Sequence, residues 1–324
     1  MRAVLCESFG PPESLVVRDI EEPVAGSGEA VVRVEAAALN FMDTLIIQGK
    51  YQVRAEPPFS PAAELAGTVE SVGEGVTSVK PGDRVMGFPG SGAAREKTAV
   101  DAKLLVKLPD EVTADQAAGL LVAYGTTYHA LKDRARLQPG ETLVVLGASG
   151  GVGLAAVELG KLMGARVVGC ASSDDKLEIV REKGADEVIN YATQDLRAEL
   201  KRLTDGRGVD VVYDPVGGEF AEIGVRSLAW KGRFLVIGFA AGDIPKLPLN
   251  LTLLKGCDVL GVFWGRFTEE EPQASAENTR QLLAWTASGD LKMHLHGVYS
   301  FDRAGEALGA LARREAKGKI LLKP

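Results

Sequence analysis

The chain has few of the residues on which several classes of protein depend. Its 324 residues include only three cysteines, Cys6, Cys170 and Cys257, and three histidines. Cysteines this few and this far apart do not form a disulfide framework, which favours a reducing, cytoplasmic location. The same cysteines and histidines show no spacing typical of a closed zinc site, so we expect no bound metal.

Basic clusters and long apolar runs are also missing. There are 37 lysines and arginines against 44 aspartates and glutamates, a net charge of −7 without a run of basic residues. Such a chain is not expected to bind nucleic acid or an anionic membrane. The longest uncharged stretches, residues 116–131 and 142–157, are shorter than the roughly 20 residues of a membrane-spanning helix, and the N-terminus has no signal-peptide pattern.

Glycine, in contrast, is abundant. It accounts for 38 of the 324 residues, which is about 12% against the usual ~7%. There is no Gly-X-Y period and no Gly/Ser tract, and 20 of the 38 glycines lie between residues 125 and 264. The excess predicts tight turns and close backbone contacts, concentrated in the middle of the chain.

The hydrophobic pattern changes near residue 125. Before it, short apolar runs such as Ser14–Val17, Ala30–Val34 and Ala66–Val72 are separated by turn signals, which is typical of a small barrel or sandwich. After it, strands alternate with helices, which predicts a parallel sheet covered on both faces. The predicted strands are Thr142–Leu146, Arg166–Cys170, Glu187–Tyr191, Val209–Tyr213, Phe234–Ile237 and Asp258–Phe263. The last 60 or so residues are mixed and end in a predicted strand, Lys319–Leu322.

One glycine-rich motif predicts a dinucleotide site. Ala148, Ser149, Gly150, Gly151, Val152 and Gly153 follow the G-x-G-x-x-G pattern with alanine in the first position, directly after Gly147. A predicted strand ends just before the motif and a predicted helix begins inside it, as the fingerprint requires. Glycine lets a pyrophosphate approach backbone N–H groups at the positive end of the helix. The alternative is an ordinary strand–turn–helix connection.

The end of the second strand favours NADPH over NADH. NAD sites usually place an acidic residue there to bind the ribose 2′-hydroxyl, but this strand runs into Ser172 and Ser173, with Lys176 following. Small hydroxyls and a lysine suit a 2′-phosphate. Asp174 and Asp175 complicate the choice, although they are also explained as acids in the first turn of a helix whose N-cap is Ser173.

Motifs in order along nearly the whole chain carry a family resemblance. They are Asn40-Phe41-Met42-Asp43, Gly49-Lys50-Tyr51, Pro61-Ala62-Ala63-Glu64-Leu65-Ala66-Gly67, Val72-Gly73-Glu74-Gly75-Val76, Lys80-Pro81-Gly82-Asp83-Arg84-Val85, Gly184-Ala185-Asp186, Ile189-Asn190-Tyr191, Asp214-Pro215-Val216-Gly217-Gly218 and Gly318-Lys319-Ile320. In these stretches the chain resembles the zinc-free quinone oxidoreductases of the medium-chain dehydrogenase/reductase superfamily.

The resemblance implies an α/β architecture with two domains. Residues 1–124 and 265–324 would form a β-rich, GroES-like catalytic domain, and residues 125–264 a Rossmann domain with a doubly wound parallel sheet. Members of the family commonly form homodimers by pairing the edge strands of two Rossmann sheets. The apolar stretch Val259–Phe263 is the candidate for that edge.

The resemblance also implies roles for individual residues. Asn40, Tyr51 and Thr127 would form the catalytic, nicotinamide end, with Tyr51 as proton donor or only a half-buried turn residue, and Thr127 holding the nicotinamide amide or only capping a helix. The other implied cofactor contacts, beyond the glycine-rich motif and the Ser172, Ser173 and Lys176 group, are Tyr191, Gly238, Phe239, Phe263, Trp264 and Lys319.

Several further residues are given structural roles. Asp43 and Glu64 are interpreted as hydrogen-bond acceptors beside the site, and Trp230 and Trp285 as core residues. Zinc-dependent members of the superfamily carry a cysteine ligand where this chain has Asn40, and a His–Glu pair where it has Ala63 and Glu64. These differences favour a mechanism without zinc.

The function expected from these features is reduction of quinones by hydride transfer from NADPH, without zinc. An alternative is NADPH-dependent reduction of α,β-unsaturated carbonyls or enoyl thioesters, for which Arg54 near Tyr51 is the one supporting charge. A third, of another class, is a non-catalytic NADPH-binding sensor or interaction protein. The expected partner of an enzyme is a small-molecule electrophile, a quinone or an enone.

Overall fold

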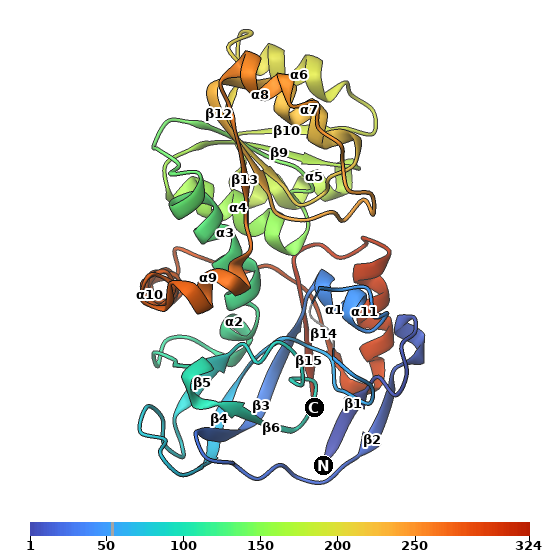
Figure 1. The fold of residues 1–324 in the computed structure, drawn as a ribbon, viewed down its shortest axis with the longest axis vertical. Helices are drawn as coiled ribbons and strands as arrows, with labels where there is room; N and C mark the ends of the chain where they lie inside the picture. Colours follow the sequence, from blue (N-terminus) through green and yellow to red (C-terminus); the bar gives the residue numbers. More distant parts are fainter. Residues whose placement is uncertain (53–54) are drawn as a thin grey trace. The chain divides into compact units, whose positions relative to one another are not determined.

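The computed structural model describes residues 1–52 and 55–324, and its chain divides into two compact units (Figure 1). Unit 1 comprises Met1–Ala123 and Gln281–Pro324, and unit 2 comprises Tyr124–Arg280. The sequence predicts one domain from residues 1–124 and 265–324 and another from residues 125–264. In the structure, Tyr124 and residues 265–280 belong to unit 2 instead of to the unit that contains both chain ends. The reason is packing within unit 2: Phe267 stacks on His129 at 3.8 Å between ring centroids, and Asn278 Nδ2 donates to Asp133 at 2.8 Å.

Unit 1 is built on a seven-stranded sheet in the order β14-β15-β3-β4-β5-β7, with β6 paired to the other part of β3. All neighbours are antiparallel except β14 and β15. The strands are β3 (Glu29–Leu39), β4 (Glu64–Val72), β5 (Arg84–Gly87), β6 (Lys97–Asp101), β7 (Leu105–Lys107), β14 (Leu295–Ser300) and β15 (Lys319–Lys323), and a separate antiparallel pair is formed by β1 (Arg2–Leu5) and β2 (Val16–Asp19). The helices are α1 (Phe41–Ile46), α2 (Ala114–Ala118), α11 (Ala304–Ala312) and the part of α10 (Pro272–Ser288) that begins at Gln281. There are 3₁₀ turns at Pro12–Ser14, Ala102–Leu104 and Phe301–Arg303.

The C-terminal strand explains why both chain ends form one unit. In β15, Ile320 pairs with Leu39 of β3, and Leu321 pairs with Ala38. Ile320 and Leu322 point into the core of unit 1, where they join alternate residues of β3. The register places Lys319, the first residue of β15, beside the end of β3, where Asn40 begins the next helix.

Unit 2 contains a six-stranded sheet in which every neighbouring pair is parallel. The strand order is β10-β9-β8-β11-β12-β13. The strands are β8 (Thr142–Val145), β9 (Arg166–Ala171), β10 (Glu187–Asn190), β11 (Val209–Asp214), β12 (Leu228–Val236) and β13 (Asp258–Gly261). The helices are α3 (Thr126–Tyr128), α4 (Gly151–Leu162), α5 (Asp174–Glu182), α6 (Leu196–Leu203), α7 (Glu219–Ser227), α8 (Asn250–Lys255), α9 (Trp264–Glu270) and the first part of α10, with a π-helical turn at His129–Arg134. A second π-helical turn, Leu121–Gly125, begins in unit 1 and enters unit 2 at Tyr124.

Alternate residues of the strands in unit 2 face different helices. Val144, Val168 and Val212 belong to a core cluster with residues of α6, α7 and α8. On the other face, a Cβ at Gly160 of α4 would lie 2.7 Å from Leu143 Cδ2, so this helix packs closely on β8. Both faces of the sheet are therefore buried, which confirms the predicted doubly wound parallel sheet beside a β-rich domain.

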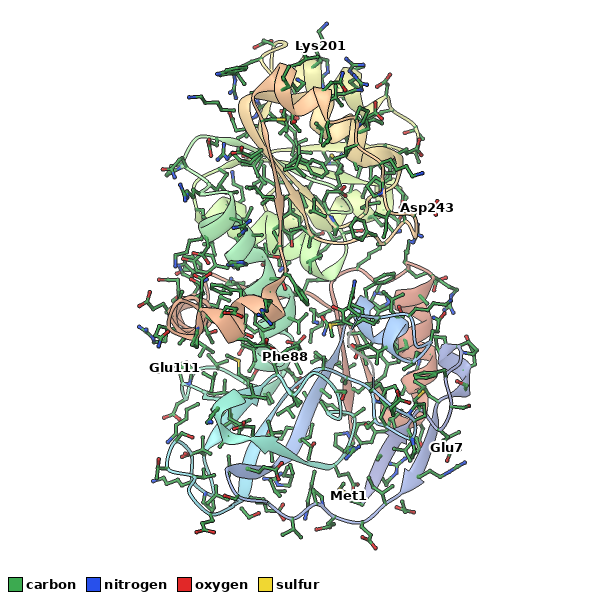
Figure 2. The ribbon with its side chains drawn as sticks, in the orientation of Figure 1. Met1, Glu7, Phe88, Glu111, Lys201 and Asp243 are labelled. Carbon is green, nitrogen blue, oxygen red and sulfur yellow. The ribbon has the colours of Figure 1, made fainter. Side chains whose placement is uncertain are left out.

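Charged residues lie on the surfaces of both units. Glu7, Glu111 and Lys201 are exposed, and Figure 2 shows them at the outside of the fold. Within the described residues, no helix combines the length and the hydropathy needed to cross a membrane.

The prediction that Trp230 belongs to the core was wrong. Trp230 lies in β12 rather than in a helix, and 70% of its surface is exposed. Its ring rests against Gly256, where a Cβ would lie 2.8 Å from the ring, so the side chain covers the chain between α8 and β13 instead of entering the sheet. Trp285, in α10, is half-buried.

Candidate functional site

The predicted cofactor residues of unit 2 gather at one edge of its sheet. In a parallel sheet all strands end at the same edge, and ligands bind where the strand order reverses. Here the reversal lies between β8 and β11, because β9 and β10 continue to one side of β8 while β11, β12 and β13 continue to the other. The glycine-rich motif follows β8 at this point.

Gly147, just before the motif, and Gly150 and Gly153 within it are each required for a different structural reason. Gly147 has φ of +57°, so it makes the tight turn after β8 that the first glycine of the fingerprint usually makes. This explains why Ala148, fully buried, is tolerated in the first position. A Cβ on Gly153 would lie 2.2 Å from Gly147 O, which leaves no room for any side chain where α4 meets the turn.

Gly150 differs from the other two, because the protein itself leaves room there. Its φ is −76°, and an added Cβ would have only Gly147 O within 4 Å, at 3.6 Å. Gly150 is the N-cap of α4, whose first backbone N–H groups carry partial positive charge. Open space at this glycine, in front of a twelve-residue helix, is what a phosphate approaching the backbone requires.

The end of β9 carries the residues expected to select the cofactor. Lys176 Nζ donates to Ser172 Oγ at 3.4 Å, so these two residues lie together after the strand. Ser173 occupies the N-cap position of α5, but its hydroxyl donates to the Asp175 carboxylate and does not cap the helix. Asp174 Oδ1 accepts a hydrogen bond from Asn190 Nδ2 at 2.9 Å. Both aspartates thus make hydrogen bonds within the protein, so they do not argue against the predicted preference for NADPH.

The remaining predicted contacts of unit 2 also follow strand ends. Tyr191 comes directly after β10 and packs on Phe220 with 4.5 Å between ring centroids. Gly238 and Phe239 follow β12, and Phe239 lies against Gly217, where a Cβ would meet its ring at 3.1 Å. Phe263, after β13, is exposed, whereas Trp264 is buried against Gly125.

Thr127 is not a helix cap. It lies inside α3, fully buried, and its Oγ1 lies 2.8 Å from the hydroxyl of Tyr213 on β11. The Thr127 hydroxyl also donates to Val152 O at 3.4 Å, so Thr127 connects the start of α4 to β11. Of the two expected roles for Thr127, capping is excluded. Contact with a nicotinamide amide stays a prediction.

The residues of unit 2 fit a dinucleotide. A bound dinucleotide would find a helix N-terminus with free space beside Gly150, hydroxyl and ammonium groups after β9, and aromatic side chains after β10 and β12. These groups suit its phosphate, ribose and adenine parts, in the order that the strands impose. The cofactor, when bound, supplies a hydride at its nicotinamide ring.

In unit 1, the predicted catalytic Asn40 belongs to a buried polar network. Asn40 Nδ2 donates to Glu64 Oε1 at 2.9 Å, and Lys319 Nζ donates to Asn40 Oδ1 at 2.6 Å, to Glu64 Oε1 at 2.8 Å and to Leu39 O at 3.2 Å. Glu64 Oε2 also accepts from the backbone N–H of Val122 at 2.9 Å. Glu64 is fully buried and Lys319 is 3% exposed. Such an ion pair is tolerated in the interior because its partners satisfy it on every side.

This network gives Lys319 a structural role in addition to the expected one. An ammonium group has three N–H donors, and the three acceptors above account for all of them. Contact of Lys319 with a cofactor stays a prediction. Glu64 is a structural acceptor, as expected.

Asp43 and Tyr51 lie next to this network. The Asp43 carboxylate accepts from the backbone N–H of Asn40 at 2.7 Å, as expected of a structural acceptor. Burial raises the pKa of Asp43 to about 7. Tyr51 is partly buried against the core, and its burial, together with the charge of Asp43, raises the pKa of its phenol. Tyr51 is consequently protonated at neutral pH and able to donate. Arg54 lies outside the described residues.

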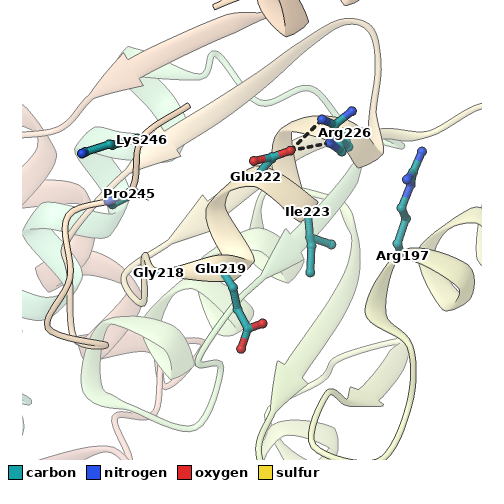
Figure 3. Close-up of a pocket in the computed structure, with 8 residues that line it drawn as sticks. All are labelled: Arg197, Gly218, Glu219, Glu222, Ile223, Arg226, Pro245 and Lys246. Atoms are coloured by element: carbon teal, nitrogen blue, oxygen red, sulfur yellow. Dashed lines mark hydrogen bonds and ion pairs between the residues drawn. The ribbon is translucent and has the colours of Figure 1, made fainter. Parts of the chain in front are cut away.

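A separate hollow of about 320 Å³ lies on unit 2, at α6 and α7 (Figure 3). Five of the eight residues that line it are charged, and Arg226 pairs with Glu222 across one turn of α7 at 2.6 Å. It contains none of the predicted site residues. The lining residues are Arg197, Gly218, Glu219, Glu222, Ile223, Arg226, Pro245 and Lys246.

One residue beside the predicted site, and one contact of a predicted site residue, were not predicted. Asp214, at the end of β11, accepts from the backbone N–H groups of Val216 at 2.8 Å and Gly217 at 2.9 Å, which shapes the loop opposite the glycine-rich turn. Its signal was the Asp-Pro-Val-Gly-Gly motif, where an aspartate begins a turn. The partnership of Lys319 with Glu64 had no local signal, because 255 positions separate the two residues.

Comparisons with known proteins agree with this architecture. A model of the alcohol dehydrogenase GroES-like domain matches residues 26–110, and one described as zinc-binding dehydrogenase matches residues 151–280. A quinone oxidoreductase-like protein 2 homolog from Nematostella vectensis is 38% identical over 99% of this chain and 88% of its own length. The chain belongs to the quinone oxidoreductase family of the medium-chain dehydrogenase/reductase superfamily. It is therefore an oxidoreductase by family, as predicted.

Solved structures give the same result. Quinone oxidoreductase from Escherichia coli, crystallised with NADPH, superposes with a TM-score of 0.92 at 29% identity, and each chain is covered fully. A mycobacterial protein, also complexed with NADPH, has a TM-score of 0.93 at 30% identity, again with both chains fully covered. The predicted fold, a GroES-like domain with a Rossmann domain, is confirmed.

Proposed function

We propose that this member of the quinone oxidoreductase family binds NADPH and reduces a small electrophile, a quinone in the first instance, without zinc. The observation that carries the proposal is the intact dinucleotide edge of unit 2; the polar, partly buried Asn40–Tyr51 region within unit 1 supports it independently. The NADPH complexes of the two structural relatives support the choice of cofactor.

In this proposal, residues of unit 2 bind the cofactor, and Tyr51 and Asn40 of unit 1 act on the acceptor. The N–H groups at the start of α4 bind the pyrophosphate, and Ser172 with Lys176 binds the 2′-phosphate. A quinone that accepts a hydride needs one proton on oxygen to become the hydroquinone. The Tyr51 hydroxyl donates this proton and is reprotonated from water, while the Asn40 amide donates a hydrogen bond to the developing oxyanion.

The independence from zinc is supported by what occupies the Asn40 and Glu64 positions. The Glu64 carboxylate and the Asn40 amide oxygen both accept from the Lys319 ammonium, so a cation of the protein already neutralises the carboxylate. Quinones and enones are polarised acceptors that do not require a metal to accept a hydride. The three cysteines are all unpaired and buried, which agrees with the proposed cytoplasmic location.

The function is tested by NADPH oxidation with a benzoquinone, a 2-alkenal and crotonyl thioester compared side by side, and with NADH in place of NADPH. Turnover with the quinone, together with a lower KM for NADPH than for NADH, is the expected result. Faster turnover of the thioester would favour the enoyl reductase, and tight NADPH binding without turnover of any acceptor would favour a sensor.

Replacing Tyr51 with phenylalanine is expected to lower kcat by about 100-fold, because the general acid is lost. The dissociation constant of NADPH should not change. Tyr299→Phe is the matched control, since Tyr299 is another half-buried tyrosine of unit 1 whose ring contacts Arg303. Equal kcat values for the Tyr51→Phe enzyme and the wild type would exclude Tyr51 as proton donor.

We also propose that two copies pair through β13. This strand is the edge of the sheet, its Val259 is 39% exposed, and Trp230, Leu253 and Leu254 form further exposed apolar surface at β12 and α8. An apolar edge strand is a template for pairing with another chain. Light scattering should give twice the chain mass of 34.2 kDa, and Val259→Lys should give the single mass. Val298→Lys, on the edge strand of unit 1, is the control, and a monomeric wild type would contradict the proposal.

A further inference from the structure

The ammonium of Lys319 occupies a cradle made entirely of oxygen atoms. A main-chain carbonyl at the end of β3 (Leu39), an amide oxygen at the N-cap of α1 (Asn40) and a carboxylate oxygen at the start of β4 (Glu64) surround it at 2.6–3.2 Å. The three acceptors come from three different elements, and Lys319 comes from a fourth, β15. The cation therefore holds together segments that are far apart in the sequence.

The path of the side chain to this cradle is also specific. At Gly119, an added Cβ would lie 2.8 Å from Lys319 Cε and 3.3 Å from its Cγ. The aliphatic part of the lysine thus fills a slot that a side chain at position 119 would block. A charge placed this deeply, with every donor used, is a built feature of the fold.

The cradle determines how the Asn40 amide is oriented. Its oxygen faces an ammonium and one of its N–H groups faces a carboxylate. A rotated amide would place its NH₂ against the ammonium and its oxygen against the carboxylate, so both charge-assisted hydrogen bonds would be lost. Asn40 is 9% exposed, so the residue that carries this oriented amide is not completely closed off from the surface.

We propose that Lys319 is a built-in monovalent cation whose role is to position Asn40: the oxygen cradle of Leu39, Asn40 and Glu64 binds an ammonium group and thereby presents the second N–H of the Asn40 amide to the substrate. Lys319 is a positioning residue in this scheme. The positioning part rests on the proposed reductase function, whereas the cation cradle does not.

Two variants and an added cation test the proposal. Lys319→Ala empties the slot, and Lys319→Met fills it without a charge. We expect both to lower kcat by about 100-fold, as misplacement of a catalytic group does, with little change in the dissociation constant of NADPH. Methylammonium chloride should restore at least about 10-fold of kcat to Lys319→Ala in a saturable manner, because it returns an ammonium to the three oxygens. It should not restore Lys319→Met, and tetramethylammonium, which has no N–H donor, should restore neither.

Thermal unfolding supplies a readout that does not depend on activity. Methylammonium should raise the Tm of Lys319→Ala saturably, relative to sodium chloride at equal ionic strength, and should leave the Tm of Lys319→Met unchanged. The control is Lys323→Ala, on the same strand, where the lysine pairs with Asp115 and is 41% exposed. This variant should keep the wild-type kcat.

The outcomes distinguish failure of the Lys319 proposal from failure of the proposed reductase function. Wild-type kcat in Lys319→Met, or a methylammonium effect on Tm without any on kcat, would overturn the positioning role. No saturable effect of methylammonium on the Tm of Lys319→Ala would overturn the cradle. If Lys319→Ala does not fold, an unchanged kcat or a weakened NADPH affinity in Lys319→Met overturns the proposal, and a lowered kcat alone supports it. A wild type that reduces no acceptor would refute the proposed function and leave the Tm measurement to decide the cradle.

Discussion

Replacing Gly153 with alanine is expected to destabilise unit 2 and to weaken cofactor binding at the same time. The new Cβ would lie 2.2 Å from Gly147 O and 2.8 Å from Ala148 Cα. Both neighbours are main-chain atoms of a turn fixed by β8 and by the hydrogen bond from Ala148 N to Cys170 O at 2.9 Å. The overlap must be relieved by moving the start of α4, at a cost of about 3 kcal/mol.

A shift of α4 also moves the N–H groups that we propose bind the pyrophosphate. Losing one hydrogen bond to a charged group costs about 1.5–3 kcal/mol, so the dissociation constant of NADPH should rise by about 10- to 100-fold. Chemical denaturation and a fluorescence titration with NADPH measure the two effects. A Gly153→Ala protein with wild-type stability would show that the turn yields more easily than its contacts indicate.

Gly150→Ala is the matched variant, because it separates binding from folding. A Cβ at position 150 meets only Gly147 O, at 3.6 Å, an ordinary contact. We therefore expect wild-type stability with an NADPH dissociation constant raised by about 10-fold or more, since the methyl group would stand where a phosphate approaches the backbone. Unchanged NADPH affinity in this variant would refute the phosphate site at this turn.

The features that the sequence predicted well are local. The strand prediction Thr142–Leu146 corresponds to β8 (Thr142–Val145), because a fully buried parallel strand is a short continuous apolar run. The phosphate turn was predictable for the same reason: its glycines, strand and helix all lie within a few residues. The alanine at position 148 was an apparent departure that the positive φ of Gly147 explains.

The features that the sequence did not predict depend on pairings across the chain. Lys319 meets Glu64 only because β15 adds to β3 and β3 pairs with β4, and no periodicity near residue 319 encodes this. The prediction that Trp230 is buried was wrong for a related reason. A large apolar residue is not always buried, and its position on β12 beside Gly256 could not be derived from a spacing that also suits a helix.

Asparagine in place of Asp43 is expected to change how stability depends on pH. The folded pKa of Asp43 is about 7 against an ordinary 3.8, mainly because of burial and despite the N–H donors of Asn40 and Ala62 and the charge of Lys319; Glu64 raises it further. Between these two values the folded protein holds a proton that the unfolded chain has lost. Stability therefore falls as pH rises through this window, and the contribution is fully present only below about pH 4.

The difference in unfolding free energy between the wild type and Asp43→Asn isolates this group, because all other titrations are shared. From about pH 4 to about pH 8, we expect the difference to move by about 2–4 kcal/mol in favour of the variant, given about 1.4 kcal/mol per pKa unit. Asp83→Asn is the control of opposite sign: hydrogen bonds from Lys107 and from the backbone of Lys80 lower the pKa of Asp83, so the wild type should gain relative to that variant as pH rises. A difference between the wild type and Asp43→Asn that stays constant with pH would mean that Asp43 is ionised in the folded protein. In that case the Lys319 ammonium, and not a proton, would neutralise both carboxylates beside Asn40.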